Sequence, residues 1–242
     1  MLFKNQKTIN EAFKISGVGL HSGVNADLLI KPAKENSGIN FCRVDIDEND
    51  LIPANFKNVI EPILCTKIAN KNGITVSTVE HLMAAFFGEG IDNALVEINA
   101  PEVPILDGSA IEFVEALRSA GIKDQFAPRK FINVKKKVEI KEGNKYISIE
   151  PSNNDLIVDF EIVYENSLIR TRRKEFRLSK DTLTDIYNSR TFCLYEDIDM
   201  IKSRGLAKGG SLDNAIVVKN NEILNEDGLR NRHEFVYHKI LD

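Results

Sequence analysis

Alternating apolar and polar positions in the first half of the chain predict a mixture of strands and helices. Residues 26–31 alternate weakly and follow a glycine-rich stretch, which favours a strand–turn–strand unit around His21. Residues 77–88 are typical of a helix that begins with a Ser77–Glu80 capping box and stops at glycine. Next come a strand at residues 93–98 and a helix at residues 109–121, with Ser109 and Glu112 as its capping box.

The second half opens with a polar stretch at residues 121–130, whose Pro128 and charged residues predict a linker between two domains. Residues 131–141 and 145–150 then alternate apolar and polar side chains across a glycine-containing turn, which predicts a hairpin. Both halves combine strands with helices, so the pattern predicts an α+β fold of two-layer units. The remaining predicted elements are a strand at 156–164, a helical segment at 178–186, a strand at 215–219 and a helix from residue 231 onward.

The first predicted helix has two faces of different character. Its apolar stripe, which we expect to face the core, consists of Val79, Leu82, Met83 and Phe86. His81 lies on the other side, where the neighbouring side chains are small. These small neighbours are Ala84, Ala85 and Gly88. Because small side chains allow a close approach, we expect another element of the fold to pack against this face.

Composition and charge narrow the class of protein. The chain has 242 residues and a formal net charge of -4, which argues against nucleic acid as a partner. It contains neither an apolar run long enough to span a membrane nor the apolar core of a signal peptide, so we predict a cytoplasmic protein. The cysteines Cys42, Cys65 and Cys193 are widely spaced and form no CxxC pair, which suits a reducing compartment.

His238 and Asp242 are four residues apart, so both project from one face of the last predicted helix. An imidazole and a carboxylate at this spacing can hold zinc, although a surface pair is the simpler interpretation. Lys239 shares their stripe, either as a salt-bridge partner of Asp242 or as a contact for an anionic substrate group. His81 adds a third ligand if the two helices meet, which leaves the open position of a catalytic zinc site. Glu80 is then either a capping residue or a general base.

Several blocks of the sequence resemble one known family, the zinc-dependent UDP-3-O-acyl-N-acetylglucosamine deacetylases of lipid A biosynthesis. The blocks include GVGLHSG, STVEHLMAA, SRTF and EFVYHKILD, and they extend over nearly the whole chain. Their positions are residues 17–23, 77–85, 90–110, 189–192, 204–217, 224–230 and 234–242. The resemblance implies a zinc enzyme that removes the N-acetyl group from a UDP-linked, 3-O-acylated glucosamine and releases acetate.

The resemblance also implies roles for the residues of these motifs. His81, His238 and Asp242 are the zinc ligands, and Glu80 is the base that activates the metal-bound water. Thr191 of SRTF donates its hydroxyl to the developing oxyanion, unless it is simply a residue satisfied by the backbone. The implied fold is two similar two-layer α/β sandwich domains, residues 1–125 and 126–242, with the active site in the cleft between them.

Substrate contacts follow from the same resemblance. Lys239 meets the diphosphate, Phe192 packs near the sugar or nucleotide, and Leu64 contacts the substrate. Cys65 lies near the metal, with a buried structural thiol as the alternative. An apolar passage for the acyl chain is formed by an insert near residues 192–217, although core packing is the simpler role for its residues. The candidate lining residues are Ile198, Ile201, Leu206, Gly210, Leu212, Ala215 and Val217.

The chain ends at Asp242 within the last predicted helix, whereas the family continues with a further catalytic histidine. We therefore expect a longer enzyme, with severely reduced turnover in the 242-residue form. The alternatives are a non-catalytic module that binds UDP-sugars or acyl lipids, and a zinc amidase for another substrate. We also expect a small-molecule glycolipid-nucleotide substrate, a monomer and transient contact with a membrane surface. His21 matches a family histidine near the site entrance, to which no role is assigned.

Overall fold

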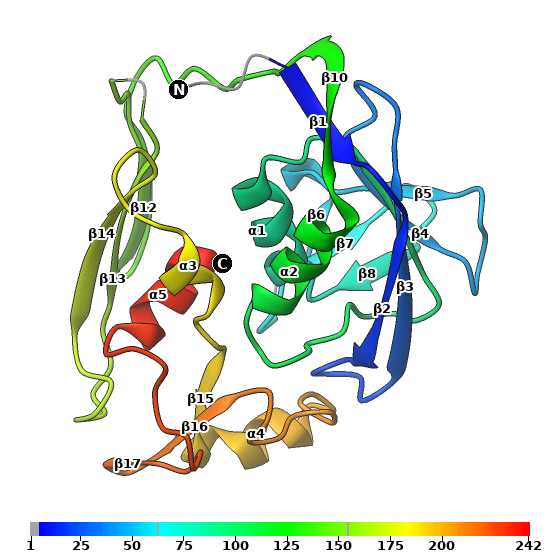
Figure 1. The fold of residues 1–242 in the computed structure, drawn as a ribbon. Helices are drawn as coiled ribbons and strands as arrows, with labels where there is room; N and C mark the ends of the chain where they lie inside the picture. The colour runs from blue at the N-terminus through cyan, green and yellow to red at the C-terminus, as the bar shows by residue number, and fades with distance from the viewer. Residues whose placement is uncertain (1–4, 62, 154) are drawn as a thin grey trace.

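The computed structural model describes residues 5–61, 63–153 and 155–242, which form a mixed α+β fold (Figure 1). A five-stranded sheet with the strand order β2-β3-β9-β4-β5 organises the first half. Strand β4 runs parallel to β9, and the other neighbours are antiparallel. The strands are β2 Phe13–Val18, β3 Asn25–Pro32, β4 Ile39–Arg43, β5 Leu51–Pro53 and β9 Ala94–Ile98.

The alternation in the sequence explains why this sheet has a buried face. Ala26, Leu28 and Ile30 of β3 are buried and alternate with more exposed neighbours, because successive side chains of a strand point to opposite faces. Helices α1 (Glu80–Glu89) and α2 (Ile111–Ala120) cover this face and complete the first core. The predicted strand–turn–strand unit around His21 is confirmed as the antiparallel pair β2 and β3.

The predicted capping boxes are wrong. Helix α1 begins at Glu80 without a side-chain cap, because the Ser77 hydroxyl donates instead to the carbonyl of Pro101. Helix α2 begins at Ile111, and Ser109 instead accepts the backbone N–H of that residue over 3.2 Å. The glycine stop of the first helix is confirmed, since Gly90 caps α1 in the left-handed conformation that glycine adopts without strain.

Smaller sheets flank this core. The predicted linker at residues 121–130 is mostly the regular strand β10 (Ile122–Pro128), which pairs antiparallel with β1 (Asn5–Ile9). Composition suggested a linker, but pairing with a strand from the other end of the first half determines the structure here. The other short elements of the first half are η1 Phe56–Asn58, β6 Val59–Ile60, β7 Lys67–Ala69 and β8 Thr75–Ser77.

The second half contains small sheets and short helices. The predicted hairpin is confirmed as β11 (Val138–Glu142) and β12 (Lys145–Ile149), with Gly143 in the left-handed region at the turn. Helix α5 (Glu234–Leu241) packs against a second antiparallel pair and contributes Phe235 and Val236 to the second core. The remaining elements are β13 Ile157–Ile162, β14 Arg172–Arg177, α3 Thr184–Tyr187, β15 Phe192–Leu194, η2 Tyr195–Asp197, α4 Ile198–Ser203, β16 Ile216–Lys219 and β17 Glu222–Ile223.

The two halves meet along a seam of close contacts. The face of α1 with small side chains packs against Tyr187 of α3, and a Cβ atom added at Gly88 would lie only 1.8 Å from the Tyr187 hydroxyl. Backbone hydrogen bonds from Ala110 to Tyr187 and from Thr191 to Gly108 cross the same seam. The predicted close packing on this face is therefore confirmed. Within the described ranges, no helix is long and apolar enough to cross a membrane.

Candidate metal centre

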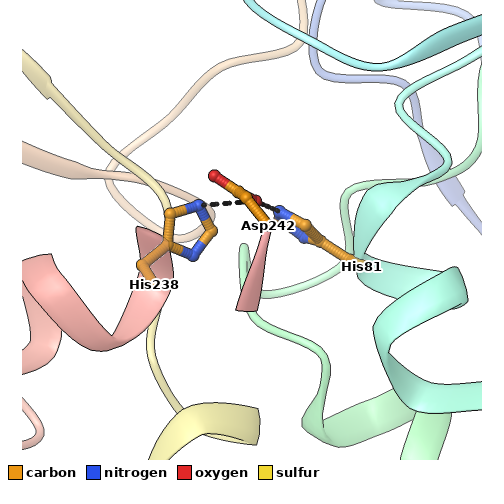
Figure 2. Close-up of side chains that lie close together, drawn as sticks. All are labelled: His81, His238 and Asp242. Carbon is orange, nitrogen blue, oxygen red and sulfur yellow. Dashed lines mark ion pairs between the residues drawn. The ribbon is translucent and has the colours of Figure 1, made fainter. Parts of the chain in front are cut away.

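Helices α1 and α5 bring together the three predicted metal ligands at the seam. His81 comes from α1, and His238 and Asp242 come from the last turns of α5 (Figure 2). One potential ligand atom from each residue lies within 4.8 Å of the other two. The predicted i,i+4 arrangement thus places an imidazole and a carboxylate beside the imidazole of a second helix.

The geometry of this group is compact. The Nε2 atoms of His238 and His81 lie 3.6 and 3.9 Å from Oδ1 of Asp242. The two rings meet edge to face, with centroids 5.1 Å apart. Both histidines are almost fully buried, and the Asp242 side chain is 28% exposed. Two imidazole nitrogens and a carboxylate oxygen are a donor set that suits zinc and leaves a fourth position open.

A backbone carbonyl orients the His238 ring. The Nδ1 atom of His238 lies 3.0 Å from the carbonyl oxygen of Ser189. Donation to this carbonyl holds the proton on Nδ1, so that the lone pair of Nε2 faces Asp242. In the described part of the chain, the buried Nδ1 of His81 has no hydrogen-bond partner. The donor types and their closeness fit a metal site.

The environment keeps each of the three groups in the protonation state that binds metal. Burial, together with the neighbouring His238, lowers the pKa of His81 to about 4, and burial also lowers the pKa of His238. Burial alone would raise the pKa of Asp242, but the charges of His238 and Lys239 bring it down to about 2. At neutral pH both imidazoles are therefore uncharged and the carboxylate is ionised, as metal ligands must be.

Glu80 occupies the first turn of α1, next to His81. Burial, reinforced by the charge of Asp242, raises the pKa of Glu80 to about 7. Its Oε2 atom accepts the backbone N–H of Thr66 over 3.1 Å, which fixes the direction of the carboxylate. A carboxylate whose pKa lies near neutrality is suited to accept and return a proton. The capping alternative for Glu80 is not realised, since α1 has no side-chain cap.

A cavity of about 380 Å³ opens beside these groups. Glu80, Asp242 and Thr66 contribute to one part of its wall, and apolar side chains from both halves form most of the rest. The sequence analysis placed Val79 and Met83 on the apolar stripe of the first helix but connected none of these apolar residues with the site. They are Val79, Met83, Ala84, Phe87, Leu156, Val158, Phe176, Leu183, Ile186, Tyr187, Ile240 and Leu241.

Thr191 and Phe192 lie in the segment that borders His238. The Thr191 backbone is fixed on both sides, because its N–H donates to Gly108 and its carbonyl accepts from Ile216. Over the described ranges, no hydrogen bond to the Thr191 hydroxyl is present, which leaves that group available to a ligand. The Phe192 ring lies 6.4 Å from the His238 ring and packs against Phe235, and Thr191 immediately precedes it.

Lys239 makes the ion pair that the spacing suggested. Its Nζ atom donates to Oδ2 of Asp242 over 2.8 Å, and it lies 5.7 Å from the centre of the Phe192 ring. The salt-bridge interpretation is therefore confirmed. Lys239 is partly exposed beside the predicted metal ligands, so a substrate could reach it. Its contact with a substrate diphosphate stays a prediction.

The residues predicted for the acyl passage are scattered between core and surface. Ala215 and Val217 are buried, whereas Gly210 and Leu212 are exposed. Ile198, Ile201 and Leu206 are half-buried, and the first two belong to α4. The cavity beside the metal ligands is lined by other residues. The passage therefore stays a prediction.

Cys65, Leu64 and His21 lie in the first half. Burial, together with the nearby charge of Glu80, raises the pKa of the Cys65 thiol, so this cysteine is a protonated neighbour of the site. Leu64 is exposed and has a left-handed backbone. His21 is buried, and its Nδ1 accepts the backbone N–H of Ala207 across the seam.

Comparison with known proteins identifies the family of this chain. The family model for UDP-3-O-acyl N-acetylglycosamine deacetylase matches residues 6–242. The UDP-3-O-acyl-N-acetylglucosamine deacetylase of Actinobacillus succinogenes is 45% identical over 240 residues, which cover 98% of this chain and 78% of that protein. Enzymes of the same name from Pasteurella multocida and Shewanella violacea are 44% identical with the same coverage. The chain therefore belongs to the UDP-3-O-acyl N-acetylglycosamine deacetylase family.

Proposed function

We propose that this protein hydrolyses the N-acetyl group of a UDP-3-O-(3-hydroxyacyl)-N-acetylglucosamine and releases acetate, as a step of lipid A biosynthesis. Membership of the family supports the reaction and the small-molecule substrate. The observation that carries the proposal for the site is the convergence of His81, His238 and Asp242 from two helices. Two neutral imidazoles and an ionised carboxylate form a ligand set for a catalytic rather than a structural metal.

We infer that the metal is zinc. When bound, zinc supplies a Lewis acid that polarises the amide carbonyl and lowers the pKa of a coordinated water. The ligand set supports this choice, because zinc accepts nitrogen and oxygen donors in a tetrahedral arrangement. The apolar side chains that line the cavity lower the polarity around a bound substrate, which strengthens electrostatic interactions there.

The side chains around the ligands account for proton transfer and charge stabilisation. Oε2 of Glu80 is held by Thr66, so Oε1 takes up the proton of the attacking water. The hydroxyl of Thr191 donates to the oxygen that becomes negative, a contribution of about 10²–10³ in rate for comparable donors. Lys239 binds the diphosphate, and Phe192 packs against the sugar or nucleotide.

The proposal also covers the path of the acyl chain, the two domains and the oligomeric state. The acyl chain passes through the insert at residues 192–217, near Ile198, Ile201, Gly210, Leu212, Ala215 and Val217, with Leu64 and Cys65 on the other side of the metal. Residues 1–125 and 126–242 act as two facing two-layer domains, and the protein works as a monomer that contacts membrane surfaces transiently.

Metal analysis of purified variants tests this proposal. We expect roughly one zinc per wild-type chain and loss of most of it in H81A and H238A. His233→Ala is the matched control, because His233 is a histidine next to α5 that is absent from the metal group. Stoichiometric zinc in H81A and H238A would refute the ligand assignment.

Activity assays on the same preparations test the reaction. The zinc-loaded intact gene product is expected to release acetate from UDP-3-O-acyl-N-acetylglucosamine, and a chelator should abolish that release. Retained binding of the nucleotide sugar without any turnover would favour a binding module. Equal efficiency on the substrate that lacks the 3-O-acyl chain would favour an amidase of different specificity.

A further inference from the structure

A buried ion pair lies behind the metal centre, between Arg190 and Glu234. Glu234 is fully buried, and the Arg190 side chain is only 3% exposed. Oε1 of Glu234 accepts both the Nε–H of Arg190 over 2.9 Å and its backbone N–H over 3.1 Å. The other oxygen accepts the backbone N–H of Arg230 over 2.6 Å. One carboxylate thus fixes the backbone of two separate segments.

The remaining donors of the guanidinium are also engaged. Nη1 of Arg190 donates to Asp227 over 2.8 Å, and Nη2 donates to the carbonyl of Gly228 over 2.6 Å. The cation is therefore held between the start of α5 and the loop that leads into it. A buried ion pair contributes little net stability, since its Coulomb attraction is offset by the loss of hydration. What such a fully bonded pair does provide is a fixed relative position of the segments it joins.

Those segments carry the two atoms that orient the ligand ring. Glu234 lies one helical turn before His238, on the same face of α5. Arg190 directly follows Ser189, whose carbonyl oxygen lies 3.0 Å from Nδ1 of His238. The ion pair therefore connects the helix that carries the ring to the segment that carries its acceptor, and the same segment continues into Thr191.

We propose that the Arg190–Glu234 pair is a positioning device for the metal centre, which holds the Ser189 carbonyl against His238 and so aims Nε2 at the metal. This inference rests on the proposed metal site. Groups that orient a metal-bound histidine commonly change metal affinity by about 10- to 100-fold when they are removed. Because this pair acts through the backbone of Ser189, we expect an effect near the lower end of that range.

Glu234→Gln tests the proposal, because the amide keeps the size of the side chain but loses the charge that Arg190 requires. Asp45→Asn is the matched control, since Asp45 makes a bidentate ion pair with the buried Arg43 on β4, away from α5. The measurements are zinc affinity by competition with a chelator and the visible absorption spectrum of the Co²⁺-substituted protein, with circular dichroism to confirm folding.

We expect E234Q to bind zinc about 10-fold more weakly and to show an altered Co²⁺ spectrum, while D45N retains the wild-type values. Wild-type affinity and spectrum in folded E234Q would overturn the positioning role, even if that variant melts at a lower temperature. Failure of the wild-type protein itself to bind metal would instead refute the proposed site.

A second variant covers the case in which E234Q does not fold. Asp227 is 60% exposed and holds the other side of the Arg190 guanidinium, so Asp227→Asn leaves the buried carboxylate and its backbone contacts in place. We expect a weakening of zinc binding of about 2- to 3-fold and a smaller change of the Co²⁺ spectrum in the same direction. An unchanged affinity and spectrum in D227N would then overturn the proposal.

Discussion

The two halves of the molecule contain similar kinds of elements but differ in how much apolar packing holds them together. In the first half, α1 and α2 bury one face of a five-stranded sheet, and Phe113 and Leu82 are inaccessible to solvent. In the second half, the hairpin β11–β12 is exposed along its whole length, and a small cluster around Phe235 and Val236 forms the core. The second half therefore depends more on contacts outside its own core.

The seam supplies those contacts, and it is also where the candidate metal centre lies. Leu241 and Tyr187 belong to the second half by sequence, yet they pack in the core of the first half. The metal group draws one histidine from the larger core and two residues from α5. The difference between the halves indicates that α5 is held in place jointly by its own small core and by the seam.

The largest expected effect comes from removing one buried phenylalanine ring from each core, because the two halves should then respond differently. Phe235→Ala and Phe113→Ala each remove a fully buried ring and are expected to cost about 3–5 kcal/mol of the free energy of unfolding. In F235A the loss should be concentrated in the second half, where α5 and β13–β14 lose protection against amide hydrogen exchange while the first sheet keeps it. In F113A both halves should lose protection, because the seam depends on the first core.

Hydrogen exchange followed by mass spectrometry distinguishes these outcomes segment by segment. Equal loss of protection throughout the chain in both variants would mean that the halves form one cooperative unit. The inference that the second half depends on the larger core of the first half would then be wrong.

Zinc binding should also affect the two halves differently, with a smaller change in the free energy of unfolding. A ligand that binds only the folded state stabilises it by about 2.7 kcal/mol when its free concentration is 100 times the dissociation constant. Zinc is therefore expected to raise the free energy of unfolding by about this amount and to increase exchange protection chiefly in α5. Calorimetry with and without a chelator measures the effect, and H81A should show none of it. An equal gain of stability in H81A would show that zinc acts elsewhere on the chain.

Features set by neighbouring residues could be predicted from the sequence. The hairpin turn at Gly143 and the pairing of His238 with Asp242 on one helix face depend on local periodicity. The helix with His81 was also expected, and so was the close packing against its small residues. Because such patterns repeat within a few residues, they appear in the sequence before any tertiary contact is known.

Features set by distant residues could not be predicted in this way. Thr78 adopts a left-handed backbone before α1 and donates its hydroxyl to Glu102, while the hydroxyl of Ser77, the expected cap, donates to the carbonyl of Pro101. Strand β10 looked like a linker because its partner β1 lies at the opposite end of the first half. The Arg190–Glu234 pair likewise joins residues far apart in the chain. Tertiary pairing overrides composition and local propensity at each of these places.

Substitutions at the seam between α1 and α3 should have the smallest effects on the free energy of unfolding. Gly88→Ala would place a methyl group 1.8 Å from the Tyr187 hydroxyl, so the ring must shift, and we expect a loss of about 1–3 kcal/mol in the free energy of unfolding. Tyr187→Phe removes the hydroxyl and its 3.1 Å hydrogen bond to Glu89, which should cost about 1 kcal/mol. Chemical denaturation of the two single variants and the double variant measures each term and their coupling.

The two changes should not be additive. Without the hydroxyl, the atom nearest to the new methyl group is gone, so G88A with Y187F should be less destabilised than the sum by about 0.5–3 kcal/mol. Part of the clash should persist, since Cζ of the ring would still lie 2.6 Å from the added Cβ atom. Strict additivity would mean that the cost of G88A does not come from its contact with the Tyr187 hydroxyl. In that case the close contact between α1 and α3 would not be what fixes α5 and its two metal ligands opposite His81.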